Sequence, residues 1–176
     1  MSPWKGAMLL AAALGGPGAP TALEAQAGGG GPAVGSIGAC SLLSSEEIKT
    51  LLGERTPPFF DMIPPSEERL GGGGSECFVS TIVIQLDAVT VAGFDANMQT
   101  FASRTGYERL TGVGDEAFFY EQDPGGVAHV VGIYSRIAEH VLVVSMDVND
   151  PDTPASLRPS LMILAGAAET KLRTPR

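Results

Sequence analysis

The sequence predicts a two-layer α+β domain, in which an antiparallel sheet of about four strands is covered on one face by helices. Three observations predict this class. Apolar residues recur at helical spacing in three segments, β-rich segments lie between them, and the last strands follow one another with only short turns. Strands joined by tight turns pair antiparallel. The expected order is helix, strand, helix, three strands, helix (α-β-α-β-β-β-α).

The first predicted helix covers residues 45–52. Ser44 and Glu47 have the spacing of a capping box, in which each side chain accepts a hydrogen bond from the backbone N–H of the other residue. Apolar residues then recur at helical spacing, at Ile48, Leu51 and Leu52. Gly53 follows as a natural C-terminal stop.

Residues 54–75 are expected to be irregular, because two Pro-Pro pairs and a run of glycines interrupt them. Four large apolar residues lie within this stretch: Phe59, Phe60, Met62 and Ile63. They either pack under the core, which is the more common outcome, or form an exposed contact patch. We therefore retain the four as a possible interaction patch.

Residues 77–86 are predicted to form one strand, because apolar residues recur there with period two. Phe78, Ile82, Ile84 and Leu86 would share one face of it. Residues 95–105 are predicted to form an amphipathic helix that ends at Gly106. Its apolar face would carry Phe94, Met98, Phe101 and Ala102.

Three strands and a helix complete the predicted domain. The strands are expected at residues 116–121, 127–134 and 141–148. A turn is predicted at residues 123–126, and a hairpin turn at 136–139. The last helix has one apolar side and begins at Pro154 or Pro159, since proline is common in the first turn of a helix.

The N-terminal 27 residues have the layout of a secretory signal peptide. Lys5 precedes a short apolar run, and Ala25-Gln26-Ala27 forms a small-x-small cleavage site. The run is much shorter than the about 20 apolar residues that span a bilayer. We therefore expect residues 1–27 to be removed, residues 28–38 to form a flexible Gly-rich leader, and residues 39–173 to form a single α+β domain.

An exported chain with two cysteines is expected to form a disulfide bond, here between Cys40 and Cys77. The bond would close a loop of 38 residues, counting both cysteines. Loop-closure entropy assigns about 4 kcal/mol to a loop of this length. In the alternative interpretation, Ile37 to Cys40 form a lipobox and Cys40 is acylated, which would leave Cys77 unpaired.

Net charge and motif spacing exclude several classes of function. The net charge of −9 argues against binding to nucleic acid or to anionic lipid, both of which require a basic face. The sequence contains no nucleophile elbow and no spacing typical of metal ligands, so we expect no catalytic residues, no metal and no cofactor. Asp115 and Glu116 form an acidic pair, but neighbouring residues on a strand point to opposite faces.

A calcium site is an alternative interpretation of the segment after the last predicted strand. Oxygen ligands suited to Ca²⁺ are concentrated there, at Asp147, Asn149, Asp150 and Asp152. Their spacing is not that of an EF-hand, and Asp-Pro is common in turns.

Several short stretches resemble a known group of proteins. They are Ala39-Cys40-Ser41-Leu42-Leu43-Ser44, Cys77-Phe78, Gly112-Val113-Gly114-Asp115-Glu116-Ala117-Phe118 and Lys171-Leu172. They are similar to small exported or lipid-anchored bacterial cell-envelope domains of unknown function, and more weakly to the PsbP-like α+β fold. The resemblance covers residues 39–173. It implies paired cysteines and a cell-envelope location, and no catalytic residues. Many such domains carry a lipidated cysteine directly after the signal peptide, which this chain lacks.

Together these features predict a non-catalytic exported binding or interaction domain of the bacterial cell envelope, located in the periplasm or outside the cell. Its partner would be a small molecule, lipid, peptide or envelope protein, bound on an open sheet face or in a cleft under the Pro-rich loop. No transmembrane segment is expected in the mature chain. Two alternatives remain: a small exported hydrolase that uses Asp115 or Glu116, and a structural or assembly subunit that uses the apolar patch.

Overall fold

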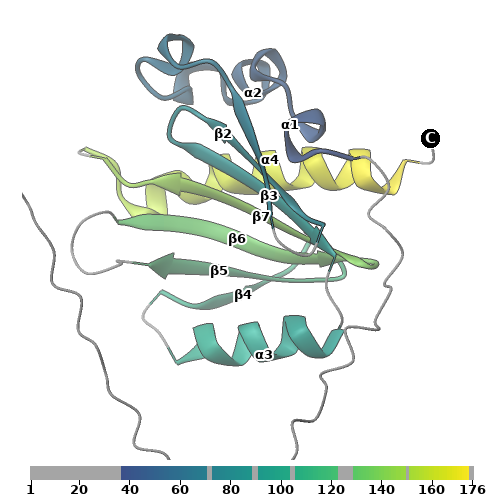
Figure 1. Cartoon of the computed structure of the whole chain (residues 1–176). Helices are drawn as coiled ribbons and strands as arrows, with labels where there is room; N and C mark the ends of the chain where they lie inside the picture. Colours follow the sequence, from purple (N-terminus) through teal and green to yellow (C-terminus); the bar gives the residue numbers. More distant parts are fainter. Residues whose placement is uncertain are drawn as a thin grey trace, which may run out of the picture. The chain divides into compact units, whose positions relative to one another are not determined.

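A seven-stranded antiparallel sheet forms the centre of the computed structural model (Figure 1). The structure describes residues 37–70, 73–88, 91–103, 106–122, 129–149 and 151–174. The predicted signal peptide, most of the predicted leader and the predicted turn at 123–126 lie outside these residues. No helix within the described ranges combines the length and the hydropathy needed to cross a membrane.

The strand order is β1-β2-β3-β7-β6-β5-β4, and every neighbouring pair is antiparallel. In chain order the strands are β1 (Ser66–Arg69), β2 (Ser75–Val79), β3 (Ile82–Ala88), β4 (Glu108–Leu110), β5 (Glu116–Gln122), β6 (Val130–Ile137) and β7 (His140–Asp147). The first three strands and the last four form two separate sets of hairpins. The pairing of β3 with β7 joins these two sets into one sheet.

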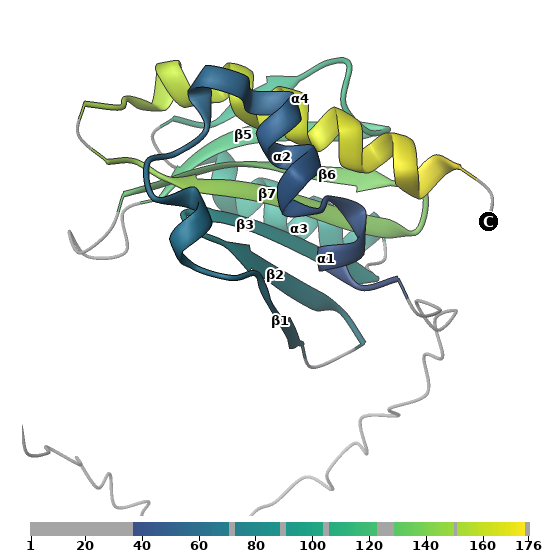
Figure 2. The ribbon, with the colours of Figure 1, turned by 90° about the horizontal axis from the view of Figure 1, so that it is seen from above.

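Helices cover both faces of the sheet, so the prediction that they cover only one face is wrong. The helices α1 (Ala39–Leu42), α2 (Ser45–Leu52) and α4 (Pro154–Arg173) lie on one side, with α4 packed on β6 and β7 (Figure 2). Helix α3 (Val91–Ala102) lies on the opposite side (Figure 1). The reason is that β5 carries Phe118, Phe119 and Tyr120 in succession. A strand that is apolar on both faces requires cover on both.

The predicted strand at residues 77–86 is instead the hairpin of β2 and β3. Ser80 and Thr81 form its two-residue turn, in which Ser80 has a φ of 58° and Val79 pairs with Ile82. The turn shifts the alternation, so Cys77 is buried in the core and Phe78 lies on the other face. The turn leaves no break in the period-two pattern, because Ser80 and Thr81 fit the alternation of a continuous strand.

Two short edge strands account for the other difference from the predicted count of about four. β1 lies within the stretch that was expected to be irregular, and all four of its residues are exposed. β4 has three residues and no buried one. Strands that bury no side chain leave no alternating pattern in the sequence.

Other local predictions are confirmed. Helix α2 spans the predicted residues, and both hydrogen bonds of the Ser44–Glu47 capping box are present. β5 and β7 lie within one residue of their predicted bounds. β6 begins and ends three residues later than predicted, so Arg136 and Ile137 belong to the strand and the hairpin turn to β7 consists of Ala138 and Glu139. Helix α4 begins at Pro154, with Pro159 inside it. Helix α3 begins four residues before its predicted start at Asp95.

The sheet separates two clusters of buried side chains. The larger cluster lies between the sheet and α1, α2 and α4. The smaller one is mainly aromatic and lies under α3, where Phe94 contacts Phe118 and Tyr134, whose rings stack on each other. Gly132 is required there, since a Cβ atom at this position would lie 2.6 Å from the Tyr120 hydroxyl oxygen. The Tyr120 ring therefore packs directly on the backbone of β6.

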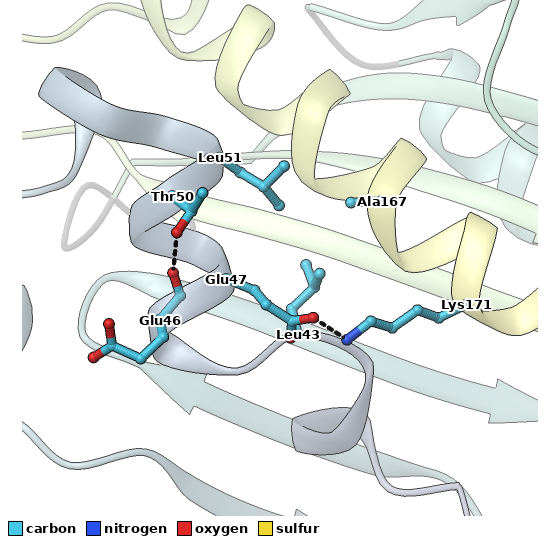
Figure 3. A pocket seen from close by; sticks show the side chains of 7 residues that line it. All are labelled: Leu43, Glu46, Glu47, Thr50, Leu51, Ala167 and Lys171. Carbon is cyan, nitrogen blue, oxygen red and sulfur yellow. Dashed lines mark hydrogen bonds and ion pairs between the residues drawn. The ribbon is translucent and has the colours of Figure 1, made fainter.

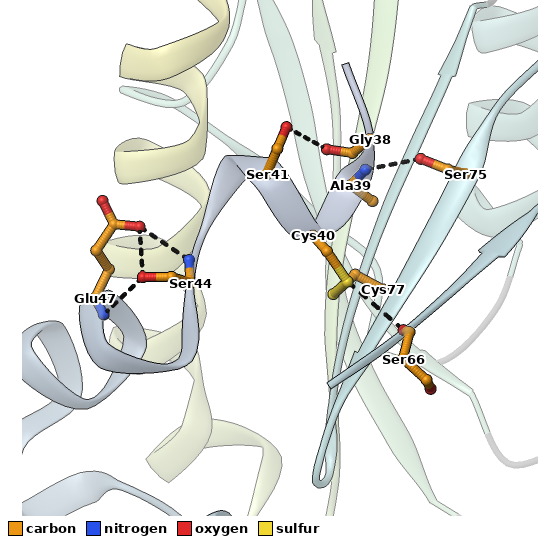
Figure 4. The surroundings of a disulfide bond; sticks show 9 residues. All are labelled: Gly38, Ala39, Cys40, Ser41, Ser44, Glu47, Ser66, Ser75 and Cys77. Carbon is orange, nitrogen blue, oxygen red and sulfur yellow. Dashed lines mark hydrogen bonds between the residues drawn. A yellow bond between two sulfur atoms is a disulfide. The ribbon is translucent and has the colours of Figure 1, made fainter. Parts of the chain in front are cut away.

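The predicted disulfide bond joins α1 to β2 (Figure 4). The Cα atoms of Cys40 and Cys77 are 4.9 Å apart. Beside them, the backbone N–H of Ala39 donates to the Ser75 hydroxyl at 2.7 Å. A four-residue helix has no stability of its own in water. The position of α1 therefore depends on this covalent bond and on burial of Ala39 and Leu42.

Replacing both cysteines by alanine is expected to lower the free energy of unfolding by about 4 kcal/mol, because the unfolded chain loses its closed loop. Urea denaturation of the Cys40→Ala/Cys77→Ala variant and of the oxidised protein measures this difference. The reduced wild-type protein is the control, since it keeps both sulfur atoms. A difference of under about 1 kcal/mol would contradict the stabilising role given to the bond.

Candidate functional site

Two hollows lie on the side of the sheet that α4 covers. The first, which we call the α2–α4 groove, has a volume of about 320 Å³. The second, which we call the α4 cleft, has a volume of about 720 Å³ and lies at the N-terminal end of α4. Small-molecule sites in proteins enclose roughly 300–1,000 Å³, so the α4 cleft falls well within this range and the groove at its lower limit.

The α2–α4 groove is an apolar depression with a charged rim. Its lining residues are Leu43, Glu46, Glu47, Thr50, Leu51, Ala167 and Lys171 (Figure 3). Leu51 points from α2 toward Ala167 on α4 (Figure 3). Lys171 donates to Glu47 at 2.5 Å and thereby joins the two helices at one end of the groove.

Glu47 is held in its ionised form by several donors. The hydrogen bond from Lys171 is the main reason that its pKa falls from 4.5 to about 2, and the backbone N–H and hydroxyl of Ser44 lower it further. A carboxylate held in this way does not exchange protons near neutral pH. Glu47 therefore has a structural role in capping α2 and binding α4.

The α4 cleft is built from five segments, which come from three distant stretches of the sequence. They are the 3₁₀ turn Gly53–Arg55, the following segment 56–59, the β2–β3 turn, the end of β7 with the connection after it, and the first turns of α4. The lining residues are Glu54, Arg55, Thr56, Pro57, Pro58, Phe59, Thr81, Met146, Asp147, Asn149, Pro151, Asp152, Ser156, Leu157 and Ser160. The sequence predicts a cleft under the Pro-rich loop, and this loop forms one wall of the α4 cleft.

Backbone hydrogen bonds hold the floor of the cleft in place. The N–H of Asp147 donates to the carbonyl of Thr81 at 3.1 Å, which binds the end of β7 to the β2–β3 turn. The N–H of Asp152 donates to the carbonyl of Asn149 at 2.6 Å and closes a tight turn. Thr153 and Ser156 then form the capping box that begins α4. The cleft is therefore largely preformed.

Three carboxylates and one guanidinium group line the cleft. Glu54, Asp147 and Asp152 form no ion pair with any cation in the described residues, and Arg55 forms none with an acid there. Partial burial raises the pKa of Asp147. The calcium interpretation gains no support, because no three acidic, His or Cys side chains within the described ranges are grouped to hold a metal ion. Asp150 lies outside those ranges.

The predicted interaction patch is divided by the structure. Phe60 is 4% exposed and belongs to the core, whereas Phe59, Met62 and Ile63 are 74%, 73% and 58% exposed. Phe59, which has a φ of 63°, also lines the α4 cleft. Asp61, which lies between Phe60 and Met62 in the sequence, forms an ion pair with Lys49 of α2. Burial of Phe60 and this ion pair hold the exposed three in place.

Asp115 and Glu116 lie beside the C-terminal end of α4. Asp115 accepts hydrogen bonds of 2.7 Å from Arg173 and from the backbone N–H of Ala138. Arg173 is the main reason that the pKa of Asp115 is lowered. Glu116 lies 3.4 Å from a guanidinium nitrogen of Arg109. These contacts give the Gly-x-Gly-Asp-Glu turn a structural role.

Sequence reasoning did not identify the part that α4 plays in the cleft. Ser156 and Ser160 are spaced one turn apart beside Leu157, within a segment assigned to an apolar helix face. The two serines interrupt the apolar pattern, and this interruption was the sequence signal that this part of α4 lines a cleft. Comparisons of the chain with models of protein families, with curated proteins and with solved structures found no significant match.

Replacement of Glu47 by glutamine is expected to separate its two roles, because glutamine still fits a capping box. Since the pKa of Glu47 is lower in the folded than in the unfolded chain, its stabilisation is complete above about pH 4.5 and is lost as the pH falls toward 2. After allowance for solvent screening, we expect the free energy of unfolding of Glu47→Gln to be lower by about 1 kcal/mol at pH 7. Between about pH 4.5 and 2, the stability of the variant should change less with pH than that of the wild-type protein. Urea denaturation across pH measures both. Glu46→Gln is the control and should change stability by under about 0.5 kcal/mol.

Replacement of Asp115 by asparagine is expected to loosen the C-terminal end of α4. It removes the charge that attracts Arg173, at a cost of about 1 kcal/mol after screening. Amide hydrogen exchange should become faster in the last turn of α4 and at Ala138. Glu139→Gln, on the same hairpin turn, is the matched control. Unchanged exchange in α4 would show that the contact with Arg173 does not hold the helix end.

Proposed function

We propose that this protein is a non-catalytic, exported binding domain of the bacterial cell envelope, and that its ligand binds in the α4 cleft. The observation that carries the proposal is the cleft itself. It has the volume of a ligand site, apolar walls, and a small number of polar groups that are not used in holding the fold together.

The location of the cleft supports this proposal. Its walls come from loops and from a helix terminus, while its floor is the end of the central strand β7. Binding residues are commonly carried by loops that a rigid scaffold positions. The α2–α4 groove is a weaker candidate, because it is smaller and the ion pair between Glu47 and Lys171 has a structural role there.

Export is supported by the signal-peptide pattern and by the disulfide bond. Disulfide bonds persist in oxidising compartments such as the periplasm and the extracellular space. Mass spectrometry of protein purified from the producing cell tests this part of the proposal. We expect a chain that begins near Gly28 and carries no acyl group.

A hydrolase that uses Asp115 and Glu116 is not favoured. Both carboxylates are paired with arginines, and Arg173 holds Asp115 in its ionised form. A general acid must be protonated at the operating pH, so a lowered pKa opposes that role. The structural-subunit alternative rests on the exposure of Phe59, Met62 and Ile63. Replacement of Met62 and Ile63, which do not line the cleft, distinguishes a surface contact from ligand binding.

A variant that fills the cleft is expected to lose ligand binding while remaining folded. Asn149→Trp places a large ring at the exposed rim, and Gln99→Trp, on the far side of the sheet, is the matched control. Thermal-shift measurements with envelope lipids, peptides and small molecules identify ligands that stabilise the wild-type protein. A ligand at 100 times its Kd adds about 2.7 kcal/mol, and only Asn149→Trp should abolish this gain. A ligand that stabilises both variants equally would place the site elsewhere.

A further inference from the structure

We propose that the α4 cleft binds a basic segment of a peptide chain, in which lysine or arginine side chains flank an apolar one. This inference rests on the proposed function and adds the chemical class of the ligand. Three observations carry it: the unpaired carboxylates of the cleft, its apolar lining, and the Ser160 hydroxyl, which lines the cleft and bonds no other described residue.

The charge of the cleft is negative even after its cations are considered. Glu54 contributes one negative charge, Asp147 and Asp152 contribute two more from the end of β7 and the connection after it, and Arg55 contributes one positive charge. The N-terminus of α4 adds about half a positive charge. A net charge of about −1.5 therefore remains within one hollow, and a cationic ligand complements it.

The arrangement of these carboxylates favours an elongated organic cation. In the described residues no three acidic, His or Cys side chains are grouped closely enough to hold a metal ion. Instead the acids line a cleft of about 720 Å³. Charges distributed in this way match a ligand whose own charges are spaced along a chain.

Apolar residues line the same cleft as the acids. Pro57, Pro58 and Phe59 come from the Pro-rich loop, Met146 from β7 and Leu157 from α4. The two prolines have little conformational freedom to lose when a ligand binds. An apolar side chain of the ligand would be buried against these residues, while flanking lysine or arginine side chains reach the carboxylates.

Ser160 distinguishes a peptide from other organic cations. The residue is 2% exposed and lines the cleft, and its hydroxyl forms no hydrogen bond with another described residue. The Ser160 oxygen is not among the fully buried polar atoms that lack a partner, so it is accessible from the cleft and can bond a ligand atom there. A peptide backbone offers a carbonyl acceptor and an N–H donor there, whereas a polyamine offers donors alone.

Fluorescence anisotropy with the purified, oxidised protein tests the inference. The probe is a labelled Lys-Leu-Lys-Phe-Lys peptide, and the controls are its Glu-Leu-Glu-Phe-Glu counterpart, spermidine and Ca²⁺. We expect the basic peptide to bind at least about tenfold more tightly than each control, with an affinity that falls as ionic strength rises.

Variants of the cleft should change the affinity in opposite directions. Asp147→Asn and Asp152→Asn should each weaken binding about two- to fivefold, and Arg55→Gln should tighten it by a similar factor. Ser160→Ala should weaken binding of the peptide and leave binding of spermidine unchanged. Glu46→Gln, which removes a carboxylate from the α2–α4 groove, is the matched control and should have no effect.

The outcomes separate this inference from the proposed function. If the acidic peptide or a neutral ligand binds and Asn149→Trp abolishes that binding, the cleft is a ligand site but the inference is overturned. Spermidine or Ca²⁺ binding as tightly as the peptide also overturns it, as does no detectable binding of the basic peptide. If the basic peptide binds equally well to Asn149→Trp, both the inference and the assignment of the cleft fail.

Discussion

The pairing of β3 with β7 is the constraint on which the rest of the structure depends. These strands form seven residue pairs, from Ile82 opposite Met146 to Ala88 opposite His140. They join the N-terminal strands to the C-terminal ones across a long stretch of sequence, and closing that stretch costs conformational entropy. Burial of Ile82, Ile84 and Leu86 against β7 and the helices offsets this cost. The ladder ends where Thr81 accepts a hydrogen bond from Asp147, and the floor of the α4 cleft begins at that point.

The sequence was informative where structure is determined locally. Ser44 and Glu47 define the start of α2, and the apolar runs of β6 and β7 reflect the burial of most of their side chains. The sequence was uninformative where contacts between distant segments determine how the elements are placed. Helix α3 lies on the second face because Phe94 packs against Phe118, a contact that neither segment reveals by itself. The cleft is a similar case. Pro57 and Pro58 indicated one wall, but Ser160 forms another only because the sheet brings α4 beside that loop.

Helix α4 is held by different contacts at its two ends. At the C-terminal end, Lys171 binds Glu47, while Arg173 and Glu169 bind the turn that carries Asp115. Nearer the N-terminal end, Arg158 binds Glu108 of β4 through two hydrogen bonds. These contacts lie outside the cleft. The residues that stabilise the helix are therefore largely distinct from those that face a ligand, so the cleft can vary in sequence while the scaffold remains intact.

The acidic composition of the chain does not by itself explain the negative charge of the cleft, as the distribution of ion pairs shows. Most lysines and arginines in the described residues pair with acids elsewhere; only Arg55 and Arg69 form no ion pair there. The unpaired acids of the cleft are themselves exposed, but three of them line one preformed hollow. At Asp147, which ends β7, partial desolvation beside that hollow raises the pKa of the carboxyl group. A carboxylate that has lost part of its hydration and has no cation beside it is unfavourable, and the cationic ligand that we propose would offset this cost.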